Sequence, residues 1–337
     1  MEFTLHKDFS SISAPEWNAL VEEGMTDVPF LRYEYLVQWW ATFGGGEWRD
    51  VELVLVSASE NGGLIGIAPL FRAVYAGREA LLLVGSIEIS DYLDLIVRAA
   101  DVGRFLSGLM DFLAQSPSLG RLPLDWYNLP DSSPTLAALQ AESSRRNWTH
   151  QQEIYRPTPR IALRGDFDTF LLGLEKKQRH EIRRKLRRAT ESDLAVRFYL
   201  VEAPADLDSE LEKFFQLMIL DAGKAGFLTS QMREHLTAVA HLAFENGYLW
   251  LAFLEIRGQP AAAAFNFDYK NKIWGYNSGL SREHMELSPG WVLLGHQIEW
   301  ACEHGRYEFD FMRGDEEYKY RFGGVNKYVM RVRVGPN

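Results

Sequence analysis

The sequence predicts a mixed α/β protein whose two halves share one fold. The 337 residues are about twice the length of an ordinary domain. In each half, helices lead into a run of strands, and a further helix and strand follow. The strand hairpins of the two halves also align at a constant offset, as a duplication predicts. We expect domains at residues 1–155 and 156–337, with the boundary near residues 151–159, a segment that holds two prolines.

The second half has the clearest pattern of elements. It begins with a short strand (160–163), one long helix (166–190), a strand (194–201) and two helices (206–223 and 230–246). Three strands with short turns between them follow at 248–256, 261–268 and 272–278. The chain ends with a helix (289–304), a strand (307–311) and a last strand near 325–334.

The first half repeats this outline. Its expected helices are 15–23, 33–43, 101–115 and 135–146, and its expected strands are 51–57, 64–73, 79–84, 93–97, 122–126 and 148–155. An offset of 196 places Gly62 on Gly258, Ala68 on Ala264 and Phe71 on Phe267. Because any hairpin favours glycine at its turn, the order of elements carries the argument for duplication together with these matches.

Composition excludes several classes of protein. A formal charge of −10 argues against a chain that binds nucleic acid over its whole surface. The single cysteine, Cys302, excludes an intramolecular disulfide and a cysteine zinc cluster, and the eight histidines lack metal-ligand spacing. We see neither a signal peptide nor an apolar run of the ~18 residues that span a membrane, and expect a cytoplasmic protein without a metal.

A basic segment stands out in this acidic chain. Residues 176–188 hold eight Lys or Arg and one Glu. On a helical wheel the apolar side chains form one stripe, from Leu171, Leu174, Ile182 and Leu186, and the basic ones group beside it, from Lys176, Arg179, Arg183, Arg184 and Arg187. The segment is either a solvated charged face or a clamp for the phosphates of a nucleotide-linked substrate, coenzyme A or an RNA end.

A second candidate site joins a strand end to a helix start. Tyr276 and Asn277 end the third strand of the run, and Ser288, Pro289 and Gly290 open the next helix. Serine is a natural N-cap, and proline a natural first helical residue. Glycine leaves the first-turn N–H groups accessible to a pyrophosphate. We therefore expect Tyr276, Asn277, Ser288 and Gly290 to bind an acyl donor, with plain helix capping as the alternative.

Polar and aromatic residues crowd an expected loop at 312–322. Lys319 there could stabilise an oxyanion or hold a phosphate, and Tyr318 or Tyr320 could protonate a leaving group. A surface loop with a solvated lysine is the alternative. In the first half, Asp91 and Asp94 flank Tyr92 at the start of an expected strand. Either could orient or deprotonate an acceptor amine, or simply cap a turn.

These motifs and their order resemble the CelD-like branch of the GNAT superfamily of acyltransferases, which is similar to the FemABX peptidyltransferases. The resemblance implies tandem GNAT-like domains with the site in the second. It also implies transfer of an acyl group from acetyl-CoA or another acyl-CoA, without a metal, to an amine or hydroxyl of a sugar- or cell-envelope-related acceptor. By this likeness, Lys319 matches the family's late Tyr-Lys motif, and Ser288-Pro289-Gly290 its helix-opening motif. The expected catalytic set is Lys319, Tyr318 and Asp91.

Two alternatives stay open. The Arg/Gln-x-x-Gly-x-Gly/Ala loop of ordinary GNAT enzymes is missing before Pro289. The donor could therefore be an aminoacyl-tRNA, as in FemABX relatives, with a cell-wall precursor as the acceptor and the basic helix on RNA phosphates. The second alternative is a non-catalytic binding protein with the same fold. It has less support, because it leaves the Lys319 cluster without a purpose.

Overall fold

The computed structural model describes residues 1–336, which form two compact units. The first unit comprises Met1–Pro157 together with Lys327–Asn337, and the second comprises Thr158–Asn326. The chain therefore returns to the first unit at its end, whereas the sequence placed residues 156–337 in one domain. The reason is the last strand, β13 (Val325–Gly335), which pairs antiparallel with β6 (Leu124–Pro130) of the first unit.

The first unit is a sheet covered by helices. Its strand order is β1-β2-β3-β4-β6-β13, with β5 beside β3. Its other strands are β1 (Glu2–His6), β2 (Glu52–Glu60), β3 (Gly63–Tyr75), β4 (Arg78–Leu83) and β5 (Ile96–Val97). The first part of β7 (Thr149–Ala162) also belongs to this unit. The helices are α1 (Ala14–Glu23), α2 (Tyr33–Ala41), α3 (Phe43–Gly46), α4 (Val102–Ala114) and α5 (Pro134–Arg146), with short 3-10 turns at Phe9–Ser11 and Pro29–Leu31. Strand β1 was not among the expected elements, although Phe3 and Leu5 alternate with polar residues along it.

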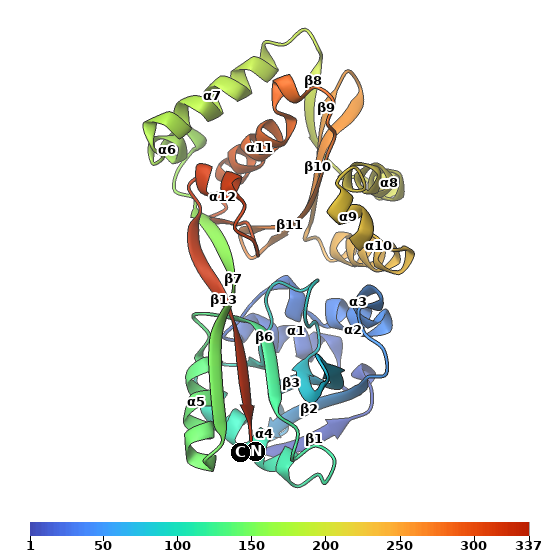
Figure 1. Cartoon of the computed structure of the whole chain (residues 1–337), viewed down its shortest axis with the longest axis vertical. Helices are drawn as coiled ribbons and strands as arrows, with labels where there is room; N and C mark the ends of the chain where they lie inside the picture. The colour runs from blue at the N-terminus through green and yellow to red at the C-terminus, as the bar shows by residue number, and fades with distance from the viewer. Residues whose placement is uncertain (337) are drawn as a thin grey trace. The chain divides into compact units, whose positions relative to one another are not determined.

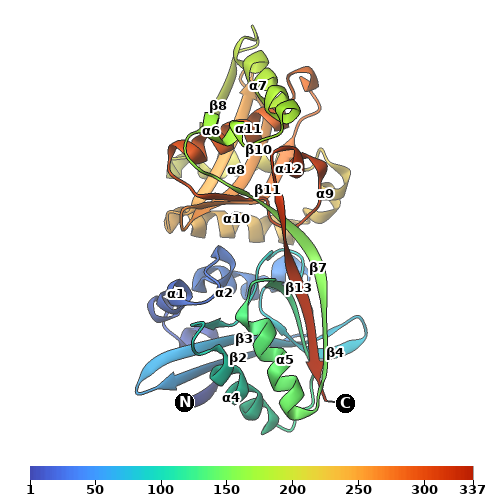
Figure 2. The same ribbon diagram turned by 90° about the vertical axis from the view of Figure 1, so that its left-hand side faces the viewer.

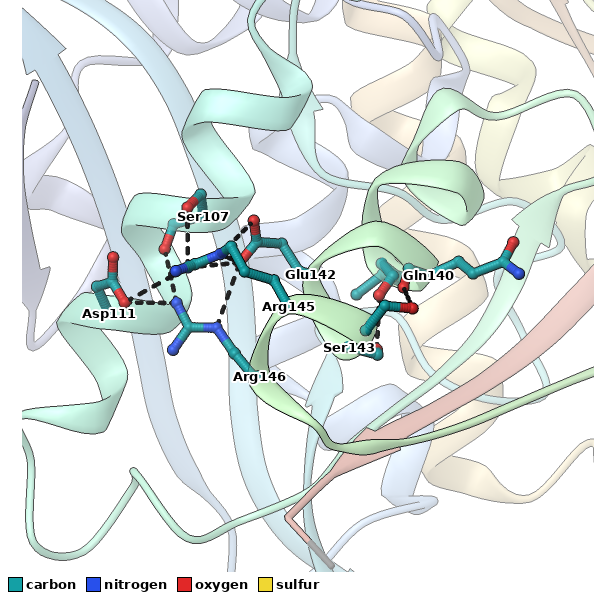
Figure 3. Close-up of polar contacts among 9 residues, drawn as sticks. Ser107, Asp111, Gln140, Glu142, Ser143, Arg145 and Arg146 are labelled. Carbon is teal, nitrogen blue, oxygen red and sulfur yellow. Dashed lines mark hydrogen bonds and ion pairs between the residues drawn. The ribbon is translucent and has the colours of Figure 1, made fainter.

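Helices α4 and α5 are joined by a polar cluster (Figure 3). Glu142 on α5 accepts hydrogen bonds from Arg145 and Arg146 of the same helix. Arg146 also reaches Asp111 and the carbonyl of Ser107 on α4. The cluster satisfies Glu142, which is only 9% exposed, and ties the two helices together.

The second unit is a three-layer α/β/α structure (Figures 1 and 2). Its strand order is β7-β12-β11-β10-β9-β8. The strands are β8 (Val196–Leu200), β9 (Leu249–Ile256), β10 (Gln259–Tyr269), β11 (Lys272–Leu280) and β12 (Glu308–Asp310). The helices are α6 (Phe167–Leu172), α7 (Lys176–Thr190), α8 (Leu207–Met218), α9 (Ala222–Phe227), α10 (Ser230–Glu245), α11 (Pro289–Glu303) and α12 (Glu317–Arg321), with 3-10 turns at Pro204–Asp206 and Met285–Leu287.

Alternation along β10 assigns these helices to the two faces of the sheet. Ala262 and Ala264 belong to the core formed with α6, α7 and α11. Phe265 points to the other face, where its ring meets Phe214 of α8 edge-on, with the centroids 5.9 Å apart. Small residues under α11 and aromatic residues under α8 therefore set the two layers.

The two hairpins, β2–β3 and β9–β10, confirm the predicted duplication at the level of strand register. Ala68 pairs with Val56 in the first hairpin, and Ala264 pairs with Ala252 in the second. Both members of the second pair lie 196 positions after their counterparts in the first. In both hairpins the strand register contains a bulge at the equivalent position. The residue left out of the pairing is Ile65 in β3 and Ala261 in β10. Since a bulge is a specific local feature, its repetition at the same offset is strong evidence for a shared ancestor of the two hairpins.

The elements after the hairpins repeat as well. In the first unit β4 is followed by α4 and by β6, which is parallel to β4. In the second unit β11 is followed by α11 and by β12, which is parallel to β11. A strand, a helix and a parallel strand form the same crossover unit in both, so the duplication extends beyond the hairpins.

Several expected elements differ from the structure. The strands expected at 148–155 and 160–163 are one strand, β7, which runs through the expected boundary at 151–159. The helix expected at 166–190 is two helices, because α6 is capped by Asp166 and ends at Gly173 before α7 begins. The helix expected at 206–223 stops at Met218, and Asp221 then caps a new helix, α9, by accepting from the N–H of Lys224 at 3.0 Å. Residues 317–321, expected as a loop, form the short helix α12.

Candidate active site

The parallel strands β11 and β12 part shortly after they meet. Their pairing covers Lys272–Trp274 on β11 and Glu308–Asp310 on β12. Strand β12 ends there, whereas β11 continues to Leu280. Within the described chain, this last part of β11 is paired with β10 alone. Ligands commonly bind beyond the carboxyl ends of parallel strands, where loops replace the strand partner.

Tyr276 and Asn277, which were expected to end the strand, lie on this parted section of β11, and the strand continues past them to Leu280. The half-buried ring of Tyr276 packs against Phe265 and Phe267, with centroid distances of 5.5 and 5.1 Å. The side-chain oxygen of Asn277 accepts a hydrogen bond from the N–H of Ser278 at 3.0 Å. Aromatic packing and this local bond hold the end of β11 in place.

The start of α11 differs from the predicted N-cap. Ser288 has a left-handed backbone, with φ 55° and ψ 57°, and its side chain makes no capping bond. Its carbonyl instead accepts from the N–H groups of Trp291 and Val292, at 3.0 and 3.1 Å. Tertiary packing of the preceding 3-10 turn, which ends at Leu287, overrides the local capping preference of serine.

Gly290 keeps a free backbone donor at this helix start. Within residues 1–336 its N–H has no hydrogen-bond partner. A Cβ built at Gly290 would approach only the side chain of Leu280, at 3.5 Å. Leu280 is the last residue of β11, so the donor lies beside the strand end and at the positive pole of a helix of 15 residues. These features suit an anionic group such as a pyrophosphate.

Lys319 is a buried residue of α12 rather than a loop residue. It is 2% exposed. Its Nζ lies 2.8 Å from the carbonyl oxygen of Arg313, 3.3 Å from that of Gly314 and 3.4 Å from that of Met312. A carboxylate oxygen of Glu316 is 2.9 Å away. An ammonium has three hydrogens, and these four acceptors occupy them, so Lys319 fixes the turn that follows β12.

Tyr318 lies next to this turn. Its ring meets Phe311 edge-on at 6.1 Å. Although the residue is 41% exposed, its phenol lies in a desolvated position, and burial together with the charge of Glu316 raises the pKa of Tyr318. The phenol therefore keeps its proton at neutral pH and can act as a donor.

Lys224 belongs to this site and was missed from the sequence. Its Nζ donates to the carbonyl and hydroxyl oxygens of Ser278 on β11, at 2.6 and 3.2 Å. Burial lowers the pKa of Lys224, the charges of Asp221 and Glu316 oppose this effect, and that of Lys319 adds to it. No sequence signal pointed to Lys224, because Ser278 lies 54 positions away and α9 was not expected as a separate helix.

Helix α7 docks through its apolar stripe, as predicted. Ile182 is 1% exposed, and Leu186 packs where a Cβ on Gly295 of α11 would come within 2.8 Å of it. Lys185 lies over the ring of Trp291 at 3.8 Å, and burial lowers its pKa. The apolar core and this cation–π contact anchor the helix on α11.

The basic face of α7 is only partly neutralised. Arg183 pairs with Asp168 at 2.7 Å, and Arg187 with Glu191 at 3.9 Å. Arg179 donates to the carbonyl of Leu172. Lys176 and Arg188 have no ion pair within the described residues. An open cavity of about 630 Å³ lies at the carboxyl end of the helix, and its charged lining comprises Arg184, Arg187, Arg188, Glu191, Asp193 and Glu286.

In the first unit, Asp91 is 9% exposed and Asp94 is fully buried. Asp94 accepts from the hydroxyl groups of Thr26, Ser133 and Thr135, each at 2.6 Å. Burial raises the pKa of Asp94, and these hydroxyl bonds oppose the rise. Asp94 therefore has a structural role, while the part of Asp91 in activating an acceptor stays a prediction.

In the first unit, a chain segment occupies the space beside the parallel strands that is open next to β11 in the second unit. Its parallel strands β4 and β6 pair at Leu81 and Leu124. Farther along β6, the carbonyl of Asn128 accepts from the N–H of Leu93 at 2.9 Å. The side-chain amide of Asn128 donates to the carbonyls of Ile87 and Ser90, both at 2.8 Å. The segment after β4 is thus bonded onto β6.

Within residues 1–336, no helix is both long and apolar enough to cross a membrane. In the same range, no group of three or more His, Cys, Asp or Glu is arranged to hold a metal ion.

Comparisons with known proteins agree with this geometry. Residues 176–320 match the family model of the acetyltransferase (GNAT) domain. No curated protein sequence gives a significant match. The fold is similar to that of FemX (12% identity, 98% of this chain and 97% of FemX covered, TM-score 0.68).

Two further structures are similar in fold. They are L-PGS from Bacillus licheniformis (13% identity, 96% and 92% covered, TM-score 0.58) and a tandem GNAT protein from the clavulanic acid biosynthesis pathway (13% identity, 100% and 99% covered, TM-score 0.51). The match to a tandem GNAT protein covers both units, and the family match covers the parted strands, α11 and Lys319. Residues 176–320 therefore form a GNAT-type acetyltransferase domain, and the chain as a whole has a duplicated GNAT-like fold.

Proposed function

We propose that the second unit transfers an acyl group from acetyl-CoA or another acyl-CoA to an amine or hydroxyl of a small-molecule or glycan-precursor acceptor related to the cell envelope. The observation that carries this proposal is the parting of β11 from β12 beside the free N–H of Gly290. The open strand edge offers backbone groups to an extended donor, and the helix start offers a site for its pyrophosphate.

The residues around this edge have separate roles in the proposal. Tyr276, Asn277, Ser288 and Gly290 line the donor position, as the sequence suggested. The acceptor attacks the thioester carbonyl, the C–S bond breaks, and the leaving thiolate takes a proton. Tyr318 is assigned to that last step because its phenol is protonated at neutral pH and lies beside the turn after β12. Lys319 contributes by fixing the turn from Met312 to Glu316.

A ligand screen tests the donor. The melting temperature of the protein is measured with coenzyme A, acetyl-CoA, longer acyl-CoAs, UDP-sugars and tRNA. A ligand at 100 times its Kd stabilises the folded state by about 2.7 kcal/mol, so a true donor raises the melting temperature. Release of the coenzyme A thiol in the presence of amines then follows turnover. If no coenzyme A ester shifts the melting temperature, the proposal is wrong.

A second candidate is transfer from an aminoacyl-tRNA to a cell-wall precursor. The charge of α7 favours it, as does the resemblance to FemABX peptidyltransferases. If α7 binds tRNA, affinity falls steeply with salt, and the double variant Lys176→Ala, Arg188→Ala weakens it. Arg197→Ala, a change on the exposed face of β8, is the matched control. Stabilisation by coenzyme A esters without any binding of tRNA excludes this candidate.

A further inference from the structure

Near the end of β11 lies the ammonium group of Lys224, which within the described residues has one N–H that makes no hydrogen bond. Two hydrogen bonds join Lys224 to Ser278, which lies beyond the last pair between β11 and β12. A lysine ammonium has three hydrogens. Within residues 1–336 the third hydrogen of Lys224 has no acceptor. Lys224 therefore reaches the open edge of β11 and still has one hydrogen bond to offer.

Lys319 does not offer such a donor. Three carbonyl oxygens and Glu316 surround its ammonium. Glu316 forms an ion pair with Lys319, and its negative charge also raises the pKa of Lys224. Of these two lysines, the half-buried Lys224 is the one whose ammonium can accept a new partner.

The position of Lys224 is fixed at both ends of the residue. Its backbone N–H is bonded to the capping carboxylate of Asp221 at 3.0 Å, and its Nζ is bonded to Ser278. The charged groups that act on it are Asp221, Glu316 and Lys319. An ammonium that has lost part of its hydration, as the lowered pKa of Lys224 indicates, attracts an anionic oxygen more strongly than one in bulk water.

We propose that the free hydrogen of Lys224 binds an anionic oxygen of the substrate, either the oxyanion formed during acyl transfer or a phosphate of the donor. This inference rests on the proposed acyl transfer at the end of β11. In the first case, the acceptor attacks the carbonyl carbon, and the electron pair of the C=O bond moves to the oxygen facing Lys224. That pair then re-forms the carbonyl as the C–S bond breaks, and the thiolate takes the proton that the acceptor loses. Lys224 stays protonated throughout.

Kinetics of three variants test the proposal. They are Lys224→Met, which keeps the length without the charge, Lys224→Arg, which keeps the charge, and Lys213→Met as the control. Lys213 is a partly exposed lysine on α8 that is ion-paired with Glu210 and makes no hydrogen bond to β11 within the described residues. If Lys224 binds the oxyanion, Lys224→Met lowers kcat by about 10²- to 10³-fold. If it binds a ground-state phosphate, Lys224→Met raises KM and leaves kcat unchanged.

In both cases Lys224→Arg restores part of the loss. A change in kcat or KM at unchanged melting temperature is what a purely structural role for the bond to Ser278 does not predict. The proposal is wrong if Lys224→Met, with an unchanged melting temperature, keeps kcat and KM within about twofold of wild type. If Lys224→Met is poorly folded, Lys224→Arg and Lys224→Gln give the same comparison.

A binding measurement separates this inference from the proposed function. If the wild-type protein transfers no acyl group from any coenzyme A ester tested, the proposed function fails. Titration calorimetry with inorganic pyrophosphate then tests Lys224 alone. Binding by wild type that is lost in Lys224→Met and kept in Lys213→Met supports the anion site. Equal binding by wild type and Lys224→Met, or no binding at all, overturns it.

Discussion

The ammonium group of Lys319 organises the turn between β12 and α12. Its bonds to three successive carbonyl oxygens and to Glu316 replace the water that burial at 2% exposure removes. Because a buried charge is stable only when its hydrogen bonds are satisfied, the turn and the lysine depend on each other. Lys319 thereby determines where the chain runs as it leaves the parallel strands.

The first prediction follows from this arrangement. Lys319→Met leaves the carbonyls and Glu316 without their donor, and we expect the free energy of unfolding of the second unit to fall by about 3 kcal/mol. Activity should fall with it. Urea denaturation followed by circular dichroism measures the loss, and Lys177→Met, at an exposed position on α7, is the control. A large loss of activity at unchanged stability would instead show that Lys319 acts on the substrate directly.

The second prediction concerns His235 on α10, which is completely buried. Burial lowers its pKa from 6.5 to about 4. Above pH 6.5 the imidazole is neutral in both states. Below it the unfolded chain takes up the proton first, so stability falls as the pH drops from 6.5 toward 4. At pH 5 the expected loss is about 2 kcal/mol.

Urea denaturation at pH 7.5 and pH 5 measures this loss. His235→Gln removes the titrating group and should flatten the pH dependence of the second unit. His241→Gln, at a partly exposed histidine on the same helix, should leave it unchanged. Equal pH dependence in wild type and His235→Gln would refute the assignment.

At the scale of elements, α7 separates its docking from its charge. Ile182 and Leu186 pack toward α11, and most of the basic side chains point to solvent. The helix holds eight basic residues and one acidic residue in a chain of net charge −10. Nothing in the packing of α7 requires so many cations on one side, which is why we assign that face to a phosphate-bearing ligand.

The third prediction tests that separation. Ile182→Ala leaves a cavity between α7 and α11 and should lower the free energy of unfolding by about 2–4 kcal/mol. Arg188→Ala should change stability by less than about 0.5 kcal/mol, because the side chain is exposed and has no ion pair in the described chain. Chemical denaturation of both variants gives the comparison. A destabilisation by Arg188→Ala as large as that by Ile182→Ala would show that the charge is structural.

At the scale of the whole molecule, the order of the chain and the order of the units differ. The second unit is one continuous segment, Thr158–Asn326, whereas the first unit needs both ends of the chain. Strand β13 supplies Val329, Val332 and Val334 to the first unit, each at most 1% exposed. Arg331 of the same strand donates two hydrogen bonds, both at 2.9 Å, to Asp125 on β6.

The fourth prediction is that the two units respond differently to truncation. Met1–Pro157 expressed alone exposes the edge of β6 and should fail to unfold cooperatively. Thr158–Asn326 expressed alone keeps its strands and helices and should melt as one transition. Thermal melts followed by circular dichroism test both fragments. A cooperative melt of Met1–Pro157 at the temperature of the first unit in the full chain would contradict the role of β13.

Several features were predictable from the sequence because they are local. Turn glycines and alternating apolar residues gave the hairpins, and the same spacing in both halves gave the duplication, down to the matched positions of Gly62 and Gly258. The apolar stripe of α7 follows from helical periodicity. Gly290 was correctly placed at a helix start because helix starts have their own boundary signals, whereas β11 runs past Tyr276 to Leu280.

Other features were decided only by tertiary structure, because they depend on residues far apart in the chain. Lys224 meets Ser278 across 54 positions, and Arg331 meets Asp125 across 206. The ring of carbonyls around Lys319 and the uncapped Ser288 arise when packing overrides a local preference. Periodicity and capping describe which element a segment forms, whereas a hydrogen bond between elements depends on how their backbones are placed in space.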